Sequence, residues 1–245
     1  MSQGSSLWSD AWRRLLANKA AVAGGLILSI LIILAIFAPW IAPHSYAYQN
    51  LELGAQAPSG EFLLGTDTLG RDLFSRILFG ARVSLLVGFV ATGVALVIGV
   101  SWGIVAGYFG GRIDSVMMRI VDVLYGLPFI IFIILLMVIF GRNIWLLFGA
   151  IGAVEWLTMA RIVRGQVLTI KNQEYVLAAQ AMGVSNIQMF RKHIFPNILG
   201  PIAVYATLTI PQVMLLEAFL SFLGLGLQPP MSSWGTLITY GGESM

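Results

Sequence analysis

Long apolar runs separated by short polar segments dominate the pattern of this chain. Residues 20–43 and 83–111 carry no charge, and residues 123–141, 143–160 and 194–226 follow, with only Glu155 and Glu217 inside the last two. A bilayer core of about 30 Å takes about 20 helical residues to cross. In lipid, segments of this length satisfy their backbone groups only as helices. The pattern predicts an all-α polytopic membrane protein with five spans.

The composition agrees with this prediction. Hydrophobic residues make up 58% of the 245 residues and charged residues 10%, whereas a soluble domain has about 45–50% and about 25%. The absence of cysteine excludes disulfides and thiolate metal sites. The formal net charge of +3 is too small to indicate a nucleic-acid partner, so the expected surroundings are membrane lipid.

Residues 1–19 precede the first run. Apolar residues recur there at helical spacing, opposite Arg13, Arg14 and Asn18: Trp8, Ala11, Trp12, Leu15 and Leu16. This segment is either an amphipathic helix in the headgroup plane or a tail whose tryptophans flank the first span. The first run is longer than the 7–15 residues typical of a signal peptide, so we expect a retained span.

The basic residues between the runs predict the orientation. With a cytoplasmic N-terminus, ten of them fall on the inside and four on the outside. Because cytoplasmic segments are enriched in Lys and Arg, we expect the N-terminus to be cytoplasmic.

The second run carries a stripe of small residues at every fourth position: Ala91, Ala95, Gly99, Gly103 and Gly107. Such a stripe allows another helix to approach closely, so Gly99, Gly103 and Gly107 are candidate helix-packing residues. Pro128 and Pro211 remove backbone donors and should bend the third and fifth spans.

Three acids lie in or beside the spans: Asp122, Glu155 and Glu217. Intramembrane acids are functional candidates because burying their charge is costly. These acids have either a structural role, in packing or hydrogen bonding, or a role in a proton relay.

The stretch "YVLAAQAMGVSNIQMFRKHIFPN" (residues 175–197) lies between the last two runs. Tyr175, Ala178, Ala179 and Met182 have the spacing of one helical face. Gly183 is placed to end that helix in a left-handed conformation. Ser185 and Gln188 have capping-box spacing, with Val184 and Met189 as a hydrophobic staple.

A second short helix should follow that cap. Ile187, Phe190 and Ile194 are spaced to line one of its faces, and Pro196 lies where the next span begins. We therefore predict two short helices across the membrane surface, with an alanine-lined face on which another protein docks.

This stretch resembles the EAA loop of ABC-importer permeases, a short cytoplasmic helix that inserts into a groove of the ATPase subunit. The resemblance rests on Ala178, Ala179, Gly183 and Pro196 at the family's spacings, and it implies that these residues form the ATPase-coupling loop within residues 165–197. Leu177, His193 and Phe195 depart from the family's Glu, Ile and Leu.

Other stretches are similar to the peptide/nickel branch of this family: "LLGTDTLGRDLFSRILFGARVSL", "RIVDVLYGLPFI", "ARIVRGQVL" and "FLSFLGLGLQPPMSSWG". The match is densest with the second permease of oligopeptide transporters. It implies a type I ABC-importer transmembrane domain over residues 20–245, preceded by the cytoplasmic segment 1–19. That family normally has six spans, so we expect a sixth to be missing after Met245.

The resemblance implies a multi-pass permease of the bacterial cytoplasmic membrane that imports oligopeptides. It also implies a homologous second permease, two ATP-binding subunits and an extracytoplasmic binding protein as partners. The chain has no Gly-x-x-x-x-Gly-Lys-[Ser/Thr] loop, so we expect it to be no enzyme and to bind no cofactor, while the ATPase subunits use ATP and Mg. His44 and His193 form no pattern typical of a catalytic or metal site, and no substrate-binding residue can be named.

Several alternatives stay open. Dipeptides or nickel are carried by similar permeases. In a different class, a proton-coupled secondary transporter would use Asp122, Glu155 and Glu217, and a non-transporting scaffold would need only the small-residue stripe.

Overall fold

A computed structural model describes residues 7–141 and 143–243. Apart from one isolated bridge between Thr66 and Asp72, the regular structure of these residues is helical, which confirms the all-α prediction. The elements are α1 (Leu7–Ala17), α2 (Lys19–Ile41), α3 (Leu73–Phe109), α4 (Gly111–Tyr125), α5 (Phe129–Phe140), α6 (Ile144–Lys171), α7 (Glu174–Ala181), α8 (Asn186–Met189), the π-helical turn η1 (Phe190–Ile194), α9 (Phe195–Phe222) and α10 (Trp234–Glu243).

The long apolar helices correspond to the predicted spans. Within the described residues, α2, α3, α6 and the stretch 186–222 are each long and apolar enough to cross a membrane, and α4 with α5 qualifies as a bent pair. Counting that pair once gives up to five spans. The number agrees with the prediction from the apolar runs.

The boundaries of the third span were predicted wrongly. Residues 123–141 do not form one helix, because α4 ends at Tyr125 and α5 begins at Phe129, with a bend of 77° between them. Pro128 has no N–H to donate and disfavours helix in the residue before it. The 12 residues of α5 rise only about 18 Å, so α5 needs α4 to complete a crossing.

The chain divides into two compact units, which are described separately. Residues 1–83 and 230–233 form the first. In it, the Asn18 side chain begins α2 by accepting hydrogen bonds from the N–H groups of Ala20 and Ala21, at 3.1 and 3.2 Å. The predictions for residues 1–6 lie outside the described residues.

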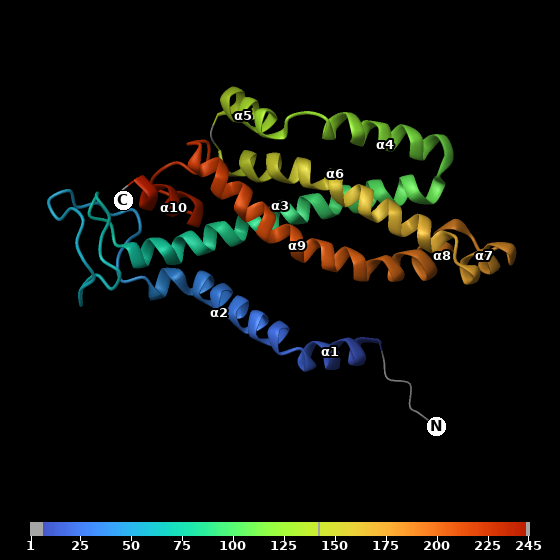
Figure 1. Cartoon of the computed structure of the whole chain (residues 1–245), viewed down its shortest axis with the longest axis horizontal. Coiled ribbons are helices and arrows are strands. Elements are labelled where there is room, and N and C mark those ends of the chain that lie inside the picture. Colours follow the sequence, from blue (N-terminus) through green and yellow to red (C-terminus); the bar gives the residue numbers. More distant parts are fainter. Residues whose placement is uncertain (1–6, 142, 244–245) are drawn as a thin grey trace. The chain divides into compact units, whose positions relative to one another are not determined.

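The second unit comprises residues 84–229 and 234–245. Its central element is α6, which packs against α4, α5 and α9 and lies along the second half of α3 (Figure 1). One side of α9 packs on α6, and α10 packs against α9 as well. Helix α9 continues through Pro201 and Pro211, so a bend at Pro211 stays a prediction.

Candidate functional site

The predicted coupling loop begins where α6 ends. After Lys171 the chain turns and forms α7. Gly183 ends α7 with φ of +78°, as predicted. The N–H of Val184 donates to the carbonyl of Ala179 at 3.2 Å and the N–H of Gly183 donates to that of Gln180 at 2.9 Å. These two bonds form a Schellman motif, which satisfies the last carbonyls of α7 and fixes the turn into α8.

Ser185 begins α8 as predicted, because its hydroxyl accepts a hydrogen bond from the N–H of Gln188 at 3.4 Å. The residues that follow form the π-helical turn η1 before α9 starts at Phe195. Pro196 therefore lies at the start of α9, directly after η1, as predicted.

The predicted single face of Ile187, Phe190 and Ile194 is wrong. Ile187 is 73% exposed, whereas Ile194 is fully buried. A π-helical turn holds more residues per turn than an α-helix, so residues after Phe190 rotate away from the face that α-helical spacing predicts.

The faces of α7 also differ from the prediction at one position. Val176 and Ala179 are buried, whereas Tyr175, Ala178 and Met182 are exposed. The prediction that Ala179 shares an outward face with Ala178 is therefore wrong. Ala179 and Val176 lie one turn apart on the side that packs inward.

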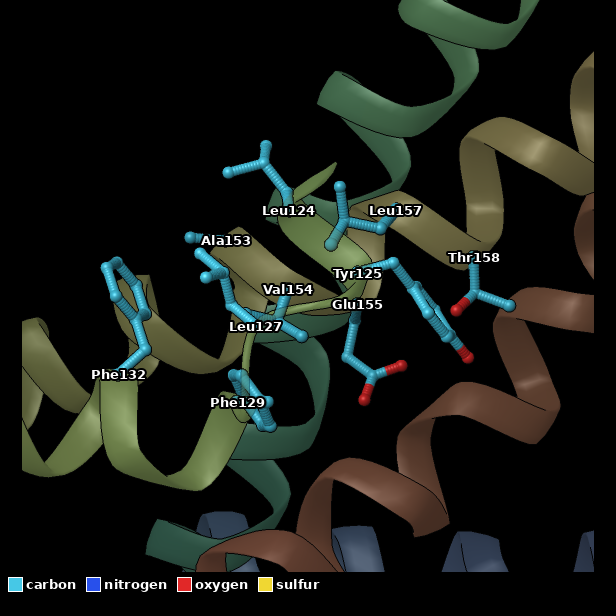
Figure 2. A pocket seen from close by; sticks show the side chains of 10 residues that line it. All are labelled: Leu124, Tyr125, Leu127, Phe129, Phe132, Ala153, Val154, Glu155, Leu157 and Thr158. Carbon is cyan, nitrogen blue, oxygen red and sulfur yellow. The ribbon is translucent and has the colours of Figure 1, made fainter. Parts of the chain in front are cut away.

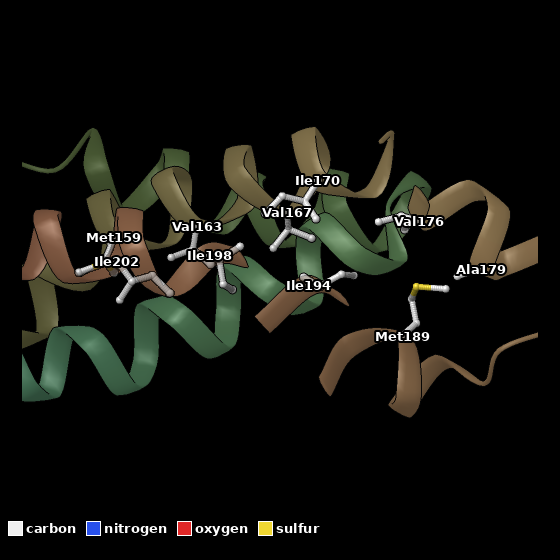
Figure 3. Close-up of a cluster of buried hydrophobic side chains, with 10 residues drawn as sticks. All are labelled: Met159, Val163, Val167, Ile170, Val176, Ala179, Met189, Ile194, Ile198 and Ile202. Atoms are coloured by element: carbon white, nitrogen blue, oxygen red, sulfur yellow. The ribbon is translucent and has the colours of Figure 1, made fainter. Parts of the chain in front are cut away.

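The inward side of the loop belongs to one hydrophobic cluster that continues into the spans. Figure 3 shows its members: Met159, Val163, Val167 and Ile170 of α6, Val176 and Ala179 of α7, Met189 of α8, and Ile194, Ile198 and Ile202 at and beyond η1. Val184 packs against this cluster too, as the predicted staple with Met189 requires. Because packed interiors are stiff, a displacement of α7 is passed to α6 and α9.

The outward side of the loop is apolar with basic neighbours. Leu177 is 49% and Met182 78% exposed, and Arg191 and Lys192 are exposed on η1. Exposed apolar side chains gathered on a short, well-capped helix are typical of an interaction surface. We call the exposed side chains of residues 175–187 the outward loop face.

Two polar contacts tie the loop to the end of α3. The Tyr108 hydroxyl donates to Oδ1 of Asn186 at 2.8 Å, and Nζ of Lys171 donates to the Tyr108 carbonyl at 2.6 Å. The sequence prediction missed all three residues. Tyr108 is separated from its partners by 63 and 78 positions, and no local spacing signals such pairs.

The predicted glycine stripe lies against α6. A β-carbon at Gly99, Gly103 or Gly107 would come within 2.6, 2.5 or 2.9 Å of atoms of α6. Contacts this close confirm these glycines as helix-packing residues, because any larger side chain would push the two backbones apart.

Two ion pairs join α4 to α6. The Arg164 guanidinium donates to both oxygens of Asp114 at 2.5 and 2.6 Å, and Arg161 donates to Asp122 at 2.8 Å. Arg161 also lies 4.3 Å from the centre of the Tyr125 ring. Asp122 is thus the partner of an arginine and lies exposed at 53%.

The other two membrane acids have different surroundings. Glu217 is buried on α9, and the Ser221 hydroxyl donates to its Oε1 at 2.8 Å. Gly235 on α10 packs so closely that a β-carbon there would lie 2.5 Å from Ala218. Glu155 lies half-buried at a cavity between α5 and α6.

Residues 65–72, within the stretch "LLGTDTLGRDLFSRILFGARVSL", form a hydrogen-bonded turn before α3. Asp67 is its centre: its carboxylate accepts from the N–H groups of Leu69 and Arg71 and pairs with the buried guanidinium groups of Arg71 and Arg76. Burial raises the pKa of Asp67, but the hydrogen bonds from Arg71 and the charges of Arg71 and Arg76 outweigh it, so the pKa lies below its usual 3.8.

The chain matches two families of known proteins. Residues 99–244 match the family described as "Binding-protein-dependent transport system inner membrane component", and residues 6–58 match the "N-terminal TM domain of oligopeptide transport permease C".

Individual relatives agree over nearly the whole chain. The oligopeptide transport system permease protein OppC of Haemophilus influenzae is 49% identical, over 99% of this chain and 79% of its own length. The dipeptide transport system permease protein DppC of Bacillus subtilis is 50% identical, over 96% and 74%. The glutathione transport system permease protein GsiD of Pectobacterium atrosepticum is 38% identical, over 94% and 77%. With its apolar helices, its packed loop and these matches, the chain belongs to the family of membrane permease subunits of binding-protein-dependent ABC transporters.

Proposed function

We propose that this chain is one of two permease subunits of an ATP-driven importer that carries oligopeptides across the bacterial cytoplasmic membrane. The observation that carries the proposal is the loop between α6 and α9. Its outward face exposes large apolar side chains, and its inward face is continuous with the core of the spans. Such a loop suits the transfer of movement from a soluble partner into the membrane.

The partners in this proposal are two ATP-binding subunits, a homologous second permease and an extracytoplasmic binding protein. The ATP-binding subunits use ATP and Mg, contact the outward loop face and move it when they close around ATP. Ala178, Gly183 and Pro196 shape that contact, whereas Ala179 supports it from inside because it is buried. The loop and the N-terminus then lie on the cytoplasmic side, as the distribution of basic residues supports.

Coupling in this scheme is a difference in free energy between two conformations of the permease. A partner shifts the equilibrium only by as much as its contact energy differs between the two. The contacts of Tyr108, Lys171 and Asn186 support such a role, because they bind the loop to α3 and α6 at once.

Oligopeptides are the proposed cargo because two findings point to them. Residues 6–58 match a domain of oligopeptide permeases, and the relative from Haemophilus influenzae is named for oligopeptide transport. Dipeptides are the second candidate, since the dipeptide permease of Bacillus subtilis is as similar.

Uptake measurements test this proposal. Cells that lack the gene and cells that carry it again are given labelled tri- to pentapeptides, with dipeptides and nickel in parallel. We expect ATP-dependent uptake of the longer peptides to disappear and return. A change confined to dipeptides or nickel would overturn the cargo, and peptide uptake that persists after ATP depletion would overturn the class.

A further inference from the structure

A cavity of about 520 Å³ opens where α4 breaks from α5 and both face α6 (Figure 2). Residues of the break and of α5, among them Tyr125, Phe129 and Phe132, line one side. The other side is lined by five residues of α6: Ala153, Val154, Glu155, Leu157 and Thr158. The walls are mainly apolar and aromatic. A volume of this size is in the range of pockets that bind small ligands.

Glu155 is the charged side chain among the residues that line this cavity. Figure 2 shows its carboxylate directed from α6 into the space beside the rings of Tyr125 and Phe129. Throughout the described residues, no hydrogen bond or ion pair reaches this carboxylate. Arg161 and Arg164, the next basic residues along α6, are paired with Asp122 and Asp114 instead.

An ionised carboxylate in an apolar cavity of a membrane span costs free energy unless a cation lies beside it. The Phe129 ring beside it favours an organic ammonium group, because ring faces attract cations as well. The Tyr125 ring already lies against the Arg161 guanidinium. The arrangement is therefore that of a site for an ammonium group attached to an apolar or variable body.

On the basis of the proposed function, we propose that this cavity binds the amino-terminal ammonium group of the transported peptide, with Glu155 as its counter-ion. That group is common to peptides of every sequence, and apolar walls accept different side chains. The site lies at the 77° bend between α4 and α5. A change in that bend therefore alters the shape of the cavity and its affinity for the peptide.

The chain contains no cysteine, which allows a direct test. Ala153→Cys places a thiol at a small residue that lines the cavity, in the assembled transporter purified without its binding protein, and labelling is measured on this subunit alone. The rate at which a maleimide labels this thiol is measured against rising concentrations of trialanine or N-acetyl-trialanine. We expect trialanine to slow the labelling and N-acetyl-trialanine to have little effect.

Substitutions of Glu155 test whether its carboxylate causes the protection. With Glu155→Gln added, the trialanine concentration that halves the labelling rate should rise about tenfold, which corresponds to about 1.4 kcal/mol. Glu155→Asp should retain most of the protection, and Glu52→Gln, the same change at an exposed position, should retain all of it.

Three results would overturn the proposal. One is equal protection by both peptides, and another is protection unchanged in Glu155→Gln. The third is a lower yield of the complex between the two permeases in Glu155→Gln. That result would mean that Glu155 pairs with a basic residue of the second permease and not with the peptide. Trialanine uptake by the unmodified transporter is measured alongside. If trialanine is taken up but does not protect the thiol, only this inference is contradicted. If trialanine is not taken up at all, the proposed function is contradicted.

Discussion

At the scale of single residues, the glycine stripe allows close contact between the backbones of α3 and α6. Gly103 is the most constrained member, since a β-carbon there would lie 2.5 Å from the carbonyl oxygen of Ala160 and 2.8 Å from the side chain of Val163. Neither atom can give way cheaply, because one is backbone and the other is fully buried. The helix pair α3 and α6 thus depends on the absence of a side chain at this position.

We expect Gly103→Val to destabilise the folded protein by about 1–3 kcal/mol, the usual cost of overpacking. Thermal unfolding of the detergent-solubilised complex measures the effect. Gly93→Val is the matched control, because it lies on the same helix and a β-carbon there meets nothing within 4 Å. Equal destabilisation by both substitutions would show that close packing on α6 is not the cause.

Asp67 gives a residue-scale prediction of pH dependence. Its pKa in the folded protein is lowered from 3.8, so its ionised form is stabilised by folding. That stabilisation is present above the unfolded pKa and is lost as the pH falls through the lower folded pKa. We expect residues 42–72 to become sensitive to an acid-active protease below about pH 4.

Asp67→Asn should be cleaved in the same segment already at neutral pH, because Arg71 and Arg76 lose their counter-charge. Glu61→Gln is a suitable control in the same segment, since Glu61 is exposed and lies outside this group of charges. A segment equally resistant at pH 3 and pH 7 would contradict the assignment.

At the scale of elements, the loop and the end of α3 act as one piece. Tyr108 is the connecting residue, since its hydroxyl bonds Asn186 of α8 and its carbonyl accepts from Lys171 of α6. The hydrophobic cluster joins the same elements from inside. Removing the hydroxyl alone leaves that packing in place.

We therefore expect Tyr108→Phe to assemble normally but to couple poorly, so that more ATP is hydrolysed for each imported peptide than in the unmodified transporter. Uptake and ATP hydrolysis are measured together in proteoliposomes. Asn186→Ala should have the same effect, and the double variant should be no worse than either, because both remove one contact. Additive losses would mean that the two residues act separately.

The sequence predicted these elements unevenly, for physical reasons. Apolar runs and the glycine stripe are local patterns, so the spans and the packing of Gly99, Gly103 and Gly107 could be read from them. The π-helical turn at residues 190–194 could not, because it shifts the faces without a distinctive residue pattern. The contacts of Tyr108 and the cavity at Glu155 depend on residues far apart in the chain.

At the scale of the whole molecule, the account requires that the loop and residues 42–72 face opposite sides of the membrane. Leu177 and Leu51 are exposed on these two segments, at 49% and 70%. With Leu51→Cys, a membrane-impermeant maleimide should label intact cells. With Leu177→Cys it should label only after the membrane is opened. The reverse result would invert the orientation that the basic residues predict.

The central claim is that the outward loop face docks on an ATP-binding subunit, and cysteine protection tests it most directly. Met182 is 78% exposed at the end of α7, and the chain has no other thiol. In inside-out vesicles, Met182→Cys should react readily with a maleimide and become protected when the ATP-binding subunits are added. Arg14→Cys on the polar face of α1, where Arg14 is exposed, should stay reactive. Protection of Met182→Cys alone is the result this account predicts, whereas an unchanged labelling rate in a complex that still hydrolyses ATP would contradict it.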